Sequence, residues 1–301
     1  MTAIMGNATA WLLYNLEQLQ IRANQDYDPQ NQSPLFNKLP AELRNSIFAL
    51  AVTEEEDLSR PYDRETYYWR PGFRGPRRFN VTLLRTCKRI WLETRPLPLI
   101  LLENLPWAFF LTDQNRRPKE CQNKGPRQSL RAEQLLTSQW QALKTIQIFI
   151  QGITKSNIEG FFQEPLLRPS TIILTVRYTD WLWWETEDPL ELDGRQMRWT
   201  RLPNSVTKVI MEFEMIQSRE QELKNLFAKL CRHEERYRWY RQDRKHLKIM
   251  HREDAWAYGK EWKWDGPTKF EGKTFAHHPP GDTMTYIVRS ITWSRDKDAN
   301  P

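Results

Sequence analysis

The chain has 301 residues, of which 39% are hydrophobic and 28% charged, so it holds enough apolar material for a core and is not globally disordered. Its formal net charge of +7 is compatible with a nucleic-acid or an acidic partner. Three cysteines do not make a disulfide framework, and no apolar run is long enough to span a membrane. We therefore expect a cytoplasmic or nuclear protein with no membrane partner.

Residues 1–34 are predicted to form a short amphipathic helix followed by a linker. Trp11, Leu12, Leu16 and Leu19 fall near one face of a helix over residues 1–22. Residues 23–34 are rich in Asn, Gln, Asp and Pro, a composition typical of a linker.

A compact helical pattern begins at residue 39. Leu39, Leu43, Ile47 and Leu50 recur at spacings of four, four and three residues, which places them in one stripe of an α-helix. Pro40 suits the first turn of that helix, where its missing N–H costs nothing.

A second helix is predicted after a long loop. The loop spans residues 53–80 and contains three prolines and two glycines. In the helix that follows, Val81, Leu84, Cys87 and Trp91 lie on one side, and prolines at positions 96 and 98 interrupt it. Residues 113–131 are predicted to be another polar, basic loop.

The rest of the chain is predicted to be an α+β body. Segments rich in β-branched and aromatic residues predict strands over residues 107–111, 146–150, 171–178, 209–215 and 286–293. A long charged helix is expected over residues 219–248, with an apolar stripe at Leu223, Leu226, Phe227 and Leu230. We expect an N-terminal helical region, residues 35–105, packed on a body of residues 106–301 with a mainly antiparallel sheet.

Two strings in the helical region carry a family resemblance. Leu39-Pro40-Ala41-Glu42-Leu43 is similar to the opening of F-box-like domains, and Glu-x-Arg triplets occur at residues 42–44 and 93–95. The region resembles fungal F-box-like proteins with two such triplets, and residues 140–148 and 177–185 resemble uncharacterised fungal proteins of the same group. The resemblance implies a non-catalytic substrate-recognition protein, an F-box-like adaptor of a ubiquitin ligase with an unknown protein target. The residues that it implies contact a Skp1-type adaptor protein are Leu39, Pro40, Leu43 and Ile47.

The two triplets also place opposite charges near two helix ends. Arg44 with Glu93, or Glu42 with Arg95, would form an ion pair that fixes the register of the helices. The helices are expected either to bind the adaptor or to support the body.

Two groups of tryptophans are candidates for an aromatic surface or for the core. Trp181, Trp183 and Trp184 follow a predicted strand, and core or interface packing is favoured over stacking on a planar ligand. Trp262 and Trp264 alternate with a lysine in a half-buried extended pattern that ends in an Asp-Gly-Pro turn.

Nucleic-acid binding is the alternative function. Residues 219–248 hold ten Lys or Arg against five Asp or Glu. Arg236, Arg238 and Arg241 alternate there with aromatic residues, so cations would meet phosphates while rings stack on bases.

Signatures of catalysis and of metal binding are missing from the sequence. Asp180 and Glu185 beside the first tryptophan group would suit the carboxylate pair of a sugar-cleaving enzyme, but nothing else of that machinery is visible. The Cys and His spacings do not match metal-ligand motifs. We expect no enzymatic activity, no cofactor and no metal.

Overall fold

The computed structural model describes residues 28–52, 54–79, 82–94, 107–121, 143–153, 155–163 and 166–295. The helix predicted within residues 1–22 and the charged side chain of Arg95 lie outside these ranges. Within them, no helix combines the length and the apolar character that crossing a membrane requires.

A nine-stranded mixed sheet forms the body. The strand order is β3-β4-β5-β7-β11-β9-β8-β6, and β10 pairs with one end of β11. The α+β class is confirmed. Five of the nine strand pairs in the described residues are antiparallel, one of them outside this sheet, between residues 54–56 and 77–79, whereas the half of the sheet from β3 to β7 is parallel. The strands are β3 (Trp107–Leu111), β4 (Thr145–Ile150), β5 (Thr171–Val176), β6 (Arg201–Leu202), β7 (Lys208–Ile216), β8 (Trp239–Arg241), β9 (His246–Ile249), β10 (Glu261–Pro267) and β11 (Thr283–Ser294).

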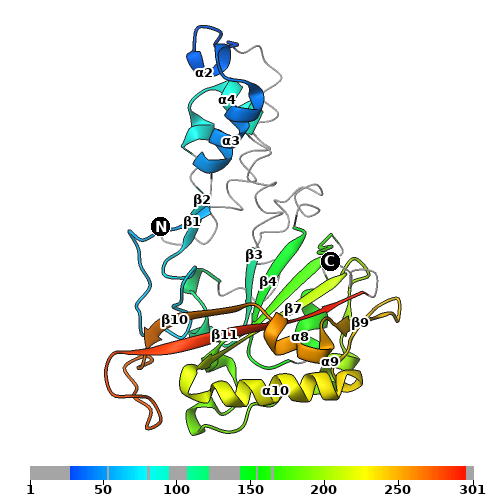
Figure 1. Ribbon diagram of the computed structural model, residues 1–301. Coiled ribbons are helices and arrows are strands. Elements are labelled where there is room, and N and C mark those ends of the chain that lie inside the picture. The colour runs from blue at the N-terminus through cyan, green and yellow to red at the C-terminus, as the bar shows by residue number, and fades with distance from the viewer. Residues whose placement is uncertain are drawn as a thin grey trace.

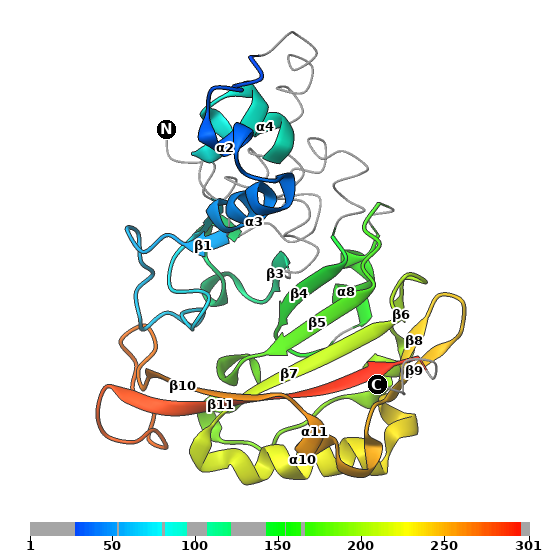
Figure 2. The ribbon, with the colours of Figure 1, turned by 45° about the horizontal axis from the view of Figure 1, so that its top comes forward.

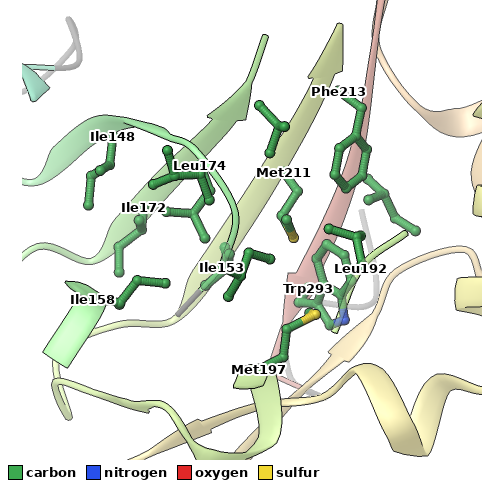
Figure 3. Close-up of a cluster of buried hydrophobic side chains, with 14 of the residues drawn as sticks. Ile148, Ile153, Ile158, Ile172, Leu174, Leu192, Met197, Met211, Phe213 and Trp293 are labelled. Atoms are coloured by element: carbon green, nitrogen blue, oxygen red, sulfur yellow. The ribbon is translucent and has the colours of Figure 1, made fainter. Parts of the chain in front are cut away.

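The core lies between the sheet and the helices on one of its faces. Alternation along each strand sends every second side chain to this face, as Ile148 on β4, Leu174 on β5 and Met211 on β7 show. Figure 3 shows these side chains directed toward Ile158 and Met197, which belong to the covering helices. These are α8 (Lys155–Phe161), α9 (Gly194–Trp199), α10 (Glu220–Arg232) and α11 (Ala255–Tyr258).

The predicted charged helix is much shorter than expected. Helix α10 ends at Arg232, and residues 239–249 form the β8-β9 hairpin, so the prediction of one helix over 219–248 is wrong. The four predicted apolar residues of its stripe are all buried. The shorter helix is explained by Trp239, which is fully buried in the body as the first residue of β8 and so belongs to the sheet.

A small helical unit stands apart from the helix-covered face. It consists of α2 (Pro34–Asn37), α3 (Ala41–Ala51), a 3-10 turn at Leu83–Arg85 and α4 (Lys88–Thr94). Figures 1 and 2 show these helices grouped together, with the sheet between them and α10. The second predicted helix is therefore split into a 3-10 turn and a short α-helix.

The predicted loop over residues 53–80 is an ordered arm rather than a free loop. Its two ends pair as strands β1 (Glu54–Glu56) and β2 (Arg77–Phe79), which are antiparallel. Between them, Tyr67 stacks on Phe270 at 5.3 Å between ring centroids, and Phe73 meets Phe149 edge-on at 4.9 Å. These contacts are non-local, so the sequence pattern of a loop did not indicate them.

A buried ion pair fastens this arm to the sheet. Arg70 is 3% exposed and its Nη1 lies 3.4 Å from Oε2 of Glu214, a residue of β7 that is also 3% exposed. The carboxylate also accepts hydrogen bonds from the backbone N–H of Tyr178 and the indole N–H of Trp264. The Arg70 guanidinium lies over the ring of Trp262, 5.1 Å from its centroid. The pair is thus enclosed by donors and rings that compensate its desolvation.

Removing one partner of this pair is expected to destabilise the fold strongly. Arg70→Met leaves the Glu214 carboxylate buried without its cation, so the free energy of unfolding should fall by about 3–5 kcal/mol. Arg74→Met is the matched control, because the half-exposed Arg74 pairs with Glu56 at the surface and should cost below about 1 kcal/mol. Urea denaturation of both variants measures the difference, and equal losses would contradict the assignment of Arg70.

Candidate functional site

The inner face of α3 packs against α4. Phe48 is 1% exposed and forms a small apolar cluster with Ile90, against which Leu35, Phe36 and Cys87 also pack. Arg44 and Phe48 are the buried residues of α3, and they are one turn apart. The helix therefore turns its Arg44-Phe48 side toward the rest of the helical unit.

Arg44 forms the first of the two ion pairs that the sequence left open. Its Nε and Nη2 donate to the two carboxylate oxygens of Glu93 at 3.0 and 3.3 Å, and its Nη1 donates to the carbonyl of Leu39 at 2.7 Å. Arg89 also donates to Glu93, at 3.2 Å. Burial alone would raise the pKa of the Glu93 carboxyl, but these hydrogen bonds outweigh it and hold the pKa below its ordinary value. In the alternative pair, Arg95 lies outside the described residues, and the Glu42 side chain is exposed.

The opposite side of α3 is an exposed apolar stripe. Leu43 is 53% exposed, Ile47 46% and Leu50 75%, and the spacing of four and three residues puts all three on one face. Pro40 is also exposed and Leu39 is half-buried. We call Leu43, Ile47 and Leu50 the α3 outer face. The Arg44–Glu93 pair determines that this stripe, and not the Phe48 side, is presented to solvent.

The tryptophans divide between the core and the surface. Trp181 and Trp184 are 5% and 2% exposed, so these two belong to the core, the favoured alternative, and not to an aromatic surface. Trp183 is 68% exposed and adopts a left-handed backbone conformation with φ of 58°. This conformation accompanies a Trp183 side chain that lies outside the core that holds Trp181 and Trp184.

The second tryptophan pair lies on β10. Trp264 stacks on Tyr286 at 4.4 Å, and Trp262 lies beneath the Arg70 guanidinium, so both are partly buried. The expected Asp-Gly-Pro turn is absent from this part of the described chain, because β10 continues through Pro267, which pairs with Thr283. Proline is tolerated there on an edge strand.

The three candidate nucleic-acid arginines do not form one basic surface. Arg241 is 4% exposed, forms an ion pair with Asp243 and donates to the carbonyl of Val206. Arg238 is half-buried beside Glu235, and Arg236 is exposed. The segment is a 3-10 turn and a strand, so it is not part of the helix over residues 219–248 that the nucleic-acid alternative expected.

Both carboxylates of the sugar-cleaving alternative have arginine partners. Asp180 is fully buried in a 2.5 Å ion pair with Arg177, and Glu185 lies 3.5 Å from Arg116. The former is a structural pair at the end of β5. In the described part of the chain, no three His, Cys, Asp or Glu side chains are arranged to hold a metal ion.

Sequence reasoning missed a cluster of titratable groups next to a cavity. The hydroxyl of the buried Tyr178 lies 2.8 Å from Nε2 of His277 and 2.9 Å from Nε2 of His278. The histidines line a cavity of about 340 Å³ beside the residues that follow β7. The adjacent histidines were visible in the sequence, but their partner is a hundred residues away.

The donor and acceptor of each hydrogen bond in this cluster follow from the contacts of the His278 ring. Nδ1 of His278 lies 2.5 Å from the carbonyl of Thr268, so it must carry the proton. Nε2 of the neutral His278 ring is then an acceptor, and the Tyr178 hydroxyl donates to it. The hydroxyl oxygen therefore accepts from Nε2 of His277. Burial raises the pKa of the Tyr178 hydroxyl and lowers the pKa of both histidines, which favours the neutral form of all three groups.

The Arg44–Glu93 pair is expected to couple α3 to α4. In a double-mutant cycle of Arg44→Met and Glu93→Gln, the coupling free energy should be about 1–2 kcal/mol, because the pair is bidentate and partly buried. A cycle of Lys224→Met and Glu220→Gln, an exposed pair on α10, should give about 0.5 kcal/mol or less. Chemical denaturation gives both values, and a coupling near zero for the first cycle would rule out the pairing.

Stability is expected to fall as the pH drops below about 6.5, the ordinary histidine value. The folded-state pKa of His277 and His278 is lowered, so in the interval below 6.5 the unfolded chain binds more protons than the folded chain. The free energy of unfolding measured at pH 7.5 and 5.5 should differ less in a His277→Asn, His278→Asn double variant. His233→Asn, at an exposed histidine, should keep the pH dependence of the parent chain.

No family model, no curated protein and no solved structure matches this chain. The resemblance to F-box-like proteins therefore depends on the two Glu-x-Arg strings and the helical pattern around them.

Proposed function

We propose that the chain is a non-catalytic protein-interaction protein that binds a Skp1-type adaptor through the α3 outer face. The observation that carries this proposal is the exposure of Leu43, Ile47 and Leu50 on a helix whose other side is fixed by the Arg44–Glu93 pair. The resemblance implies contact through Leu39, Pro40, Leu43 and Ile47. Of these, Leu43 and Ile47 belong to the α3 outer face, and Leu39 and Pro40 directly precede α3.

The physical chemistry of the face suits a protein partner. Three large aliphatic side chains in one row leave an apolar surface in water, and the free energy falls when a partner covers that surface. Amphipathic helices that dock in grooves use anchors at i, i+4 and i+7, which is the spacing of Leu43, Ile47 and Leu50. Because the Arg44–Glu93 pair already fixes α3 on its inner side, the helix also loses little conformational entropy on docking.

The body supplies a separate surface for the protein target. Leu182 is 65% exposed and is followed by the exposed Trp183 in the loop after β5. Tryptophan is enriched among the residues that dominate binding energy in protein interfaces. The left-handed backbone at Trp183 is an unusual conformation for a bulky residue, and it is consistent with a side chain presented for recognition.

Charge substitutions on the α3 outer face are expected to abolish adaptor binding without unfolding the chain. Leu43→Asp and Ile47→Asp each place a carboxylate in the proposed interface, and co-purification with a Skp1-type protein should be lost. Leu182→Asp is the matched control, since it changes an equally exposed leucine outside the helical unit and should keep binding. Circular dichroism and unfolding midpoints of all variants check that the fold is kept. A wild-type chain that fails to co-purify with the adaptor would contradict the proposal.

A further inference from the structure

A second cavity opens at the carboxyl ends of β3 and β4. Its volume is about 450 Å³, within the range of roughly 300–1,000 Å³ of small-molecule sites. Thr112 and Asp113 follow β3 in its wall, Gln151 follows β4, and α8 closes the opposite side with Asn157 and Phe161. In parallel sheets this edge is where ligands bind, because the loops after neighbouring strands meet there.

A buried arginine without a partner lines this cavity. Arg117 is 2% exposed, and its Nε and Nη2 are buried without a hydrogen-bond acceptor. In the part of the chain that the structure describes, no carboxylate forms an ion pair with it. The neighbouring buried arginines do have carboxylate partners: Arg116 pairs with Glu185, and Arg177 pairs with Asp180.

An unpaired buried guanidinium is costly. Arginine keeps its charge at every accessible pH, so it cannot escape the penalty by losing a proton. The penalty for an uncompensated buried charge is several kcal/mol. A bound anion would remove it, and the guanidinium fork matches the geometry of a carboxylate.

The other groups in the wall indicate the chemical class of the anion. Gln151 and Asn157 contribute side-chain amides, which supply N–H donors, and Phe161 and Leu111 supply apolar surface. The Asp113 carboxylate is in the same wall and is exposed, so it disfavours a dianion such as phosphate. We propose that this cavity binds a small organic monocarboxylate, with its carboxylate on Arg117 and its carbon skeleton against Phe161.

Benzoate and benzamide, which share shape and differ in charge, are suitable probes with the full chain. Benzoate should raise the unfolding midpoint in a saturable manner, whereas benzamide and inorganic phosphate at equal ionic strength should not. Arg117→Met should weaken benzoate binding roughly tenfold or more. Benzoate that fails to bind, or that binds the variant equally well, overturns the proposal. Stronger stabilisation by phosphate than by benzoate also overturns the choice of a monocarboxylate.

The stability of the ligand-free variants separates a binding role of Arg117 from a structural one. Because Arg117 has no carboxylate partner among the described residues, Arg117→Met should keep or raise the unfolding midpoint, whereas Arg177→Met, which breaks a buried pair, should lower it. A fall of equal size in both variants would mean that Arg117 is satisfied inside the protein, and it would overturn the proposal.

A steric block tests the cavity while leaving Arg117 in place. Gly160 lines the cavity from α8, and a Cβ added there meets no atom within 4 Å. Gly160→Leu should fill the space and abolish benzoate binding, whereas Gly160→Ala should keep it. Unchanged benzoate affinity in Gly160→Leu places the binding site elsewhere and overturns the proposal.

Discussion

The buried ion pair between Arg70 and Glu214 is the constraint on which the two parts of the chain depend. Glu214 lies on a central strand of the sheet, and its carboxylate gathers an arginine, an indole and a backbone amide from three distant segments. Two desolvated charges are stable only when such partners compensate them. The arm over residues 54–79 is therefore held against the sheet, and the helical unit that it leads to is held with it.

Orientation of the helical unit follows from a second, smaller pair. Arg44 links the chain before α3, through the Leu39 carbonyl, with Glu93 on α4. Phe48 completes the contact from the same side of the helix. The aliphatic row on the other side is then exposed as a consequence of packing.

The parallel half of the sheet brings its chemistry to one edge. Loops after β3 and β4 line the cavity with Arg117, and the segment after β7 lines the cavity with His277 and His278. Side chains at this edge come from segments far apart in sequence because parallel strands are joined by crossovers of a dozen or more residues. Spacing motifs do not indicate such groupings, so the sequence did not predict the roles of Tyr178, Arg70 and Arg117.

Local pattern alone determined the α+β class, five strands near their observed places and the apolar stripes of α3 and α10. Periodicity measures which residues share a face, and that property is local. Tertiary structure decided which face of α3 is inward, where the charged helix ends and which tryptophans are buried. Leu43 and Phe48 are both apolar residues of one helix, so only a partner such as Ile90 distinguishes them. Burial depends on contacts between distant segments, and the sequence of one segment does not specify which other segment covers it.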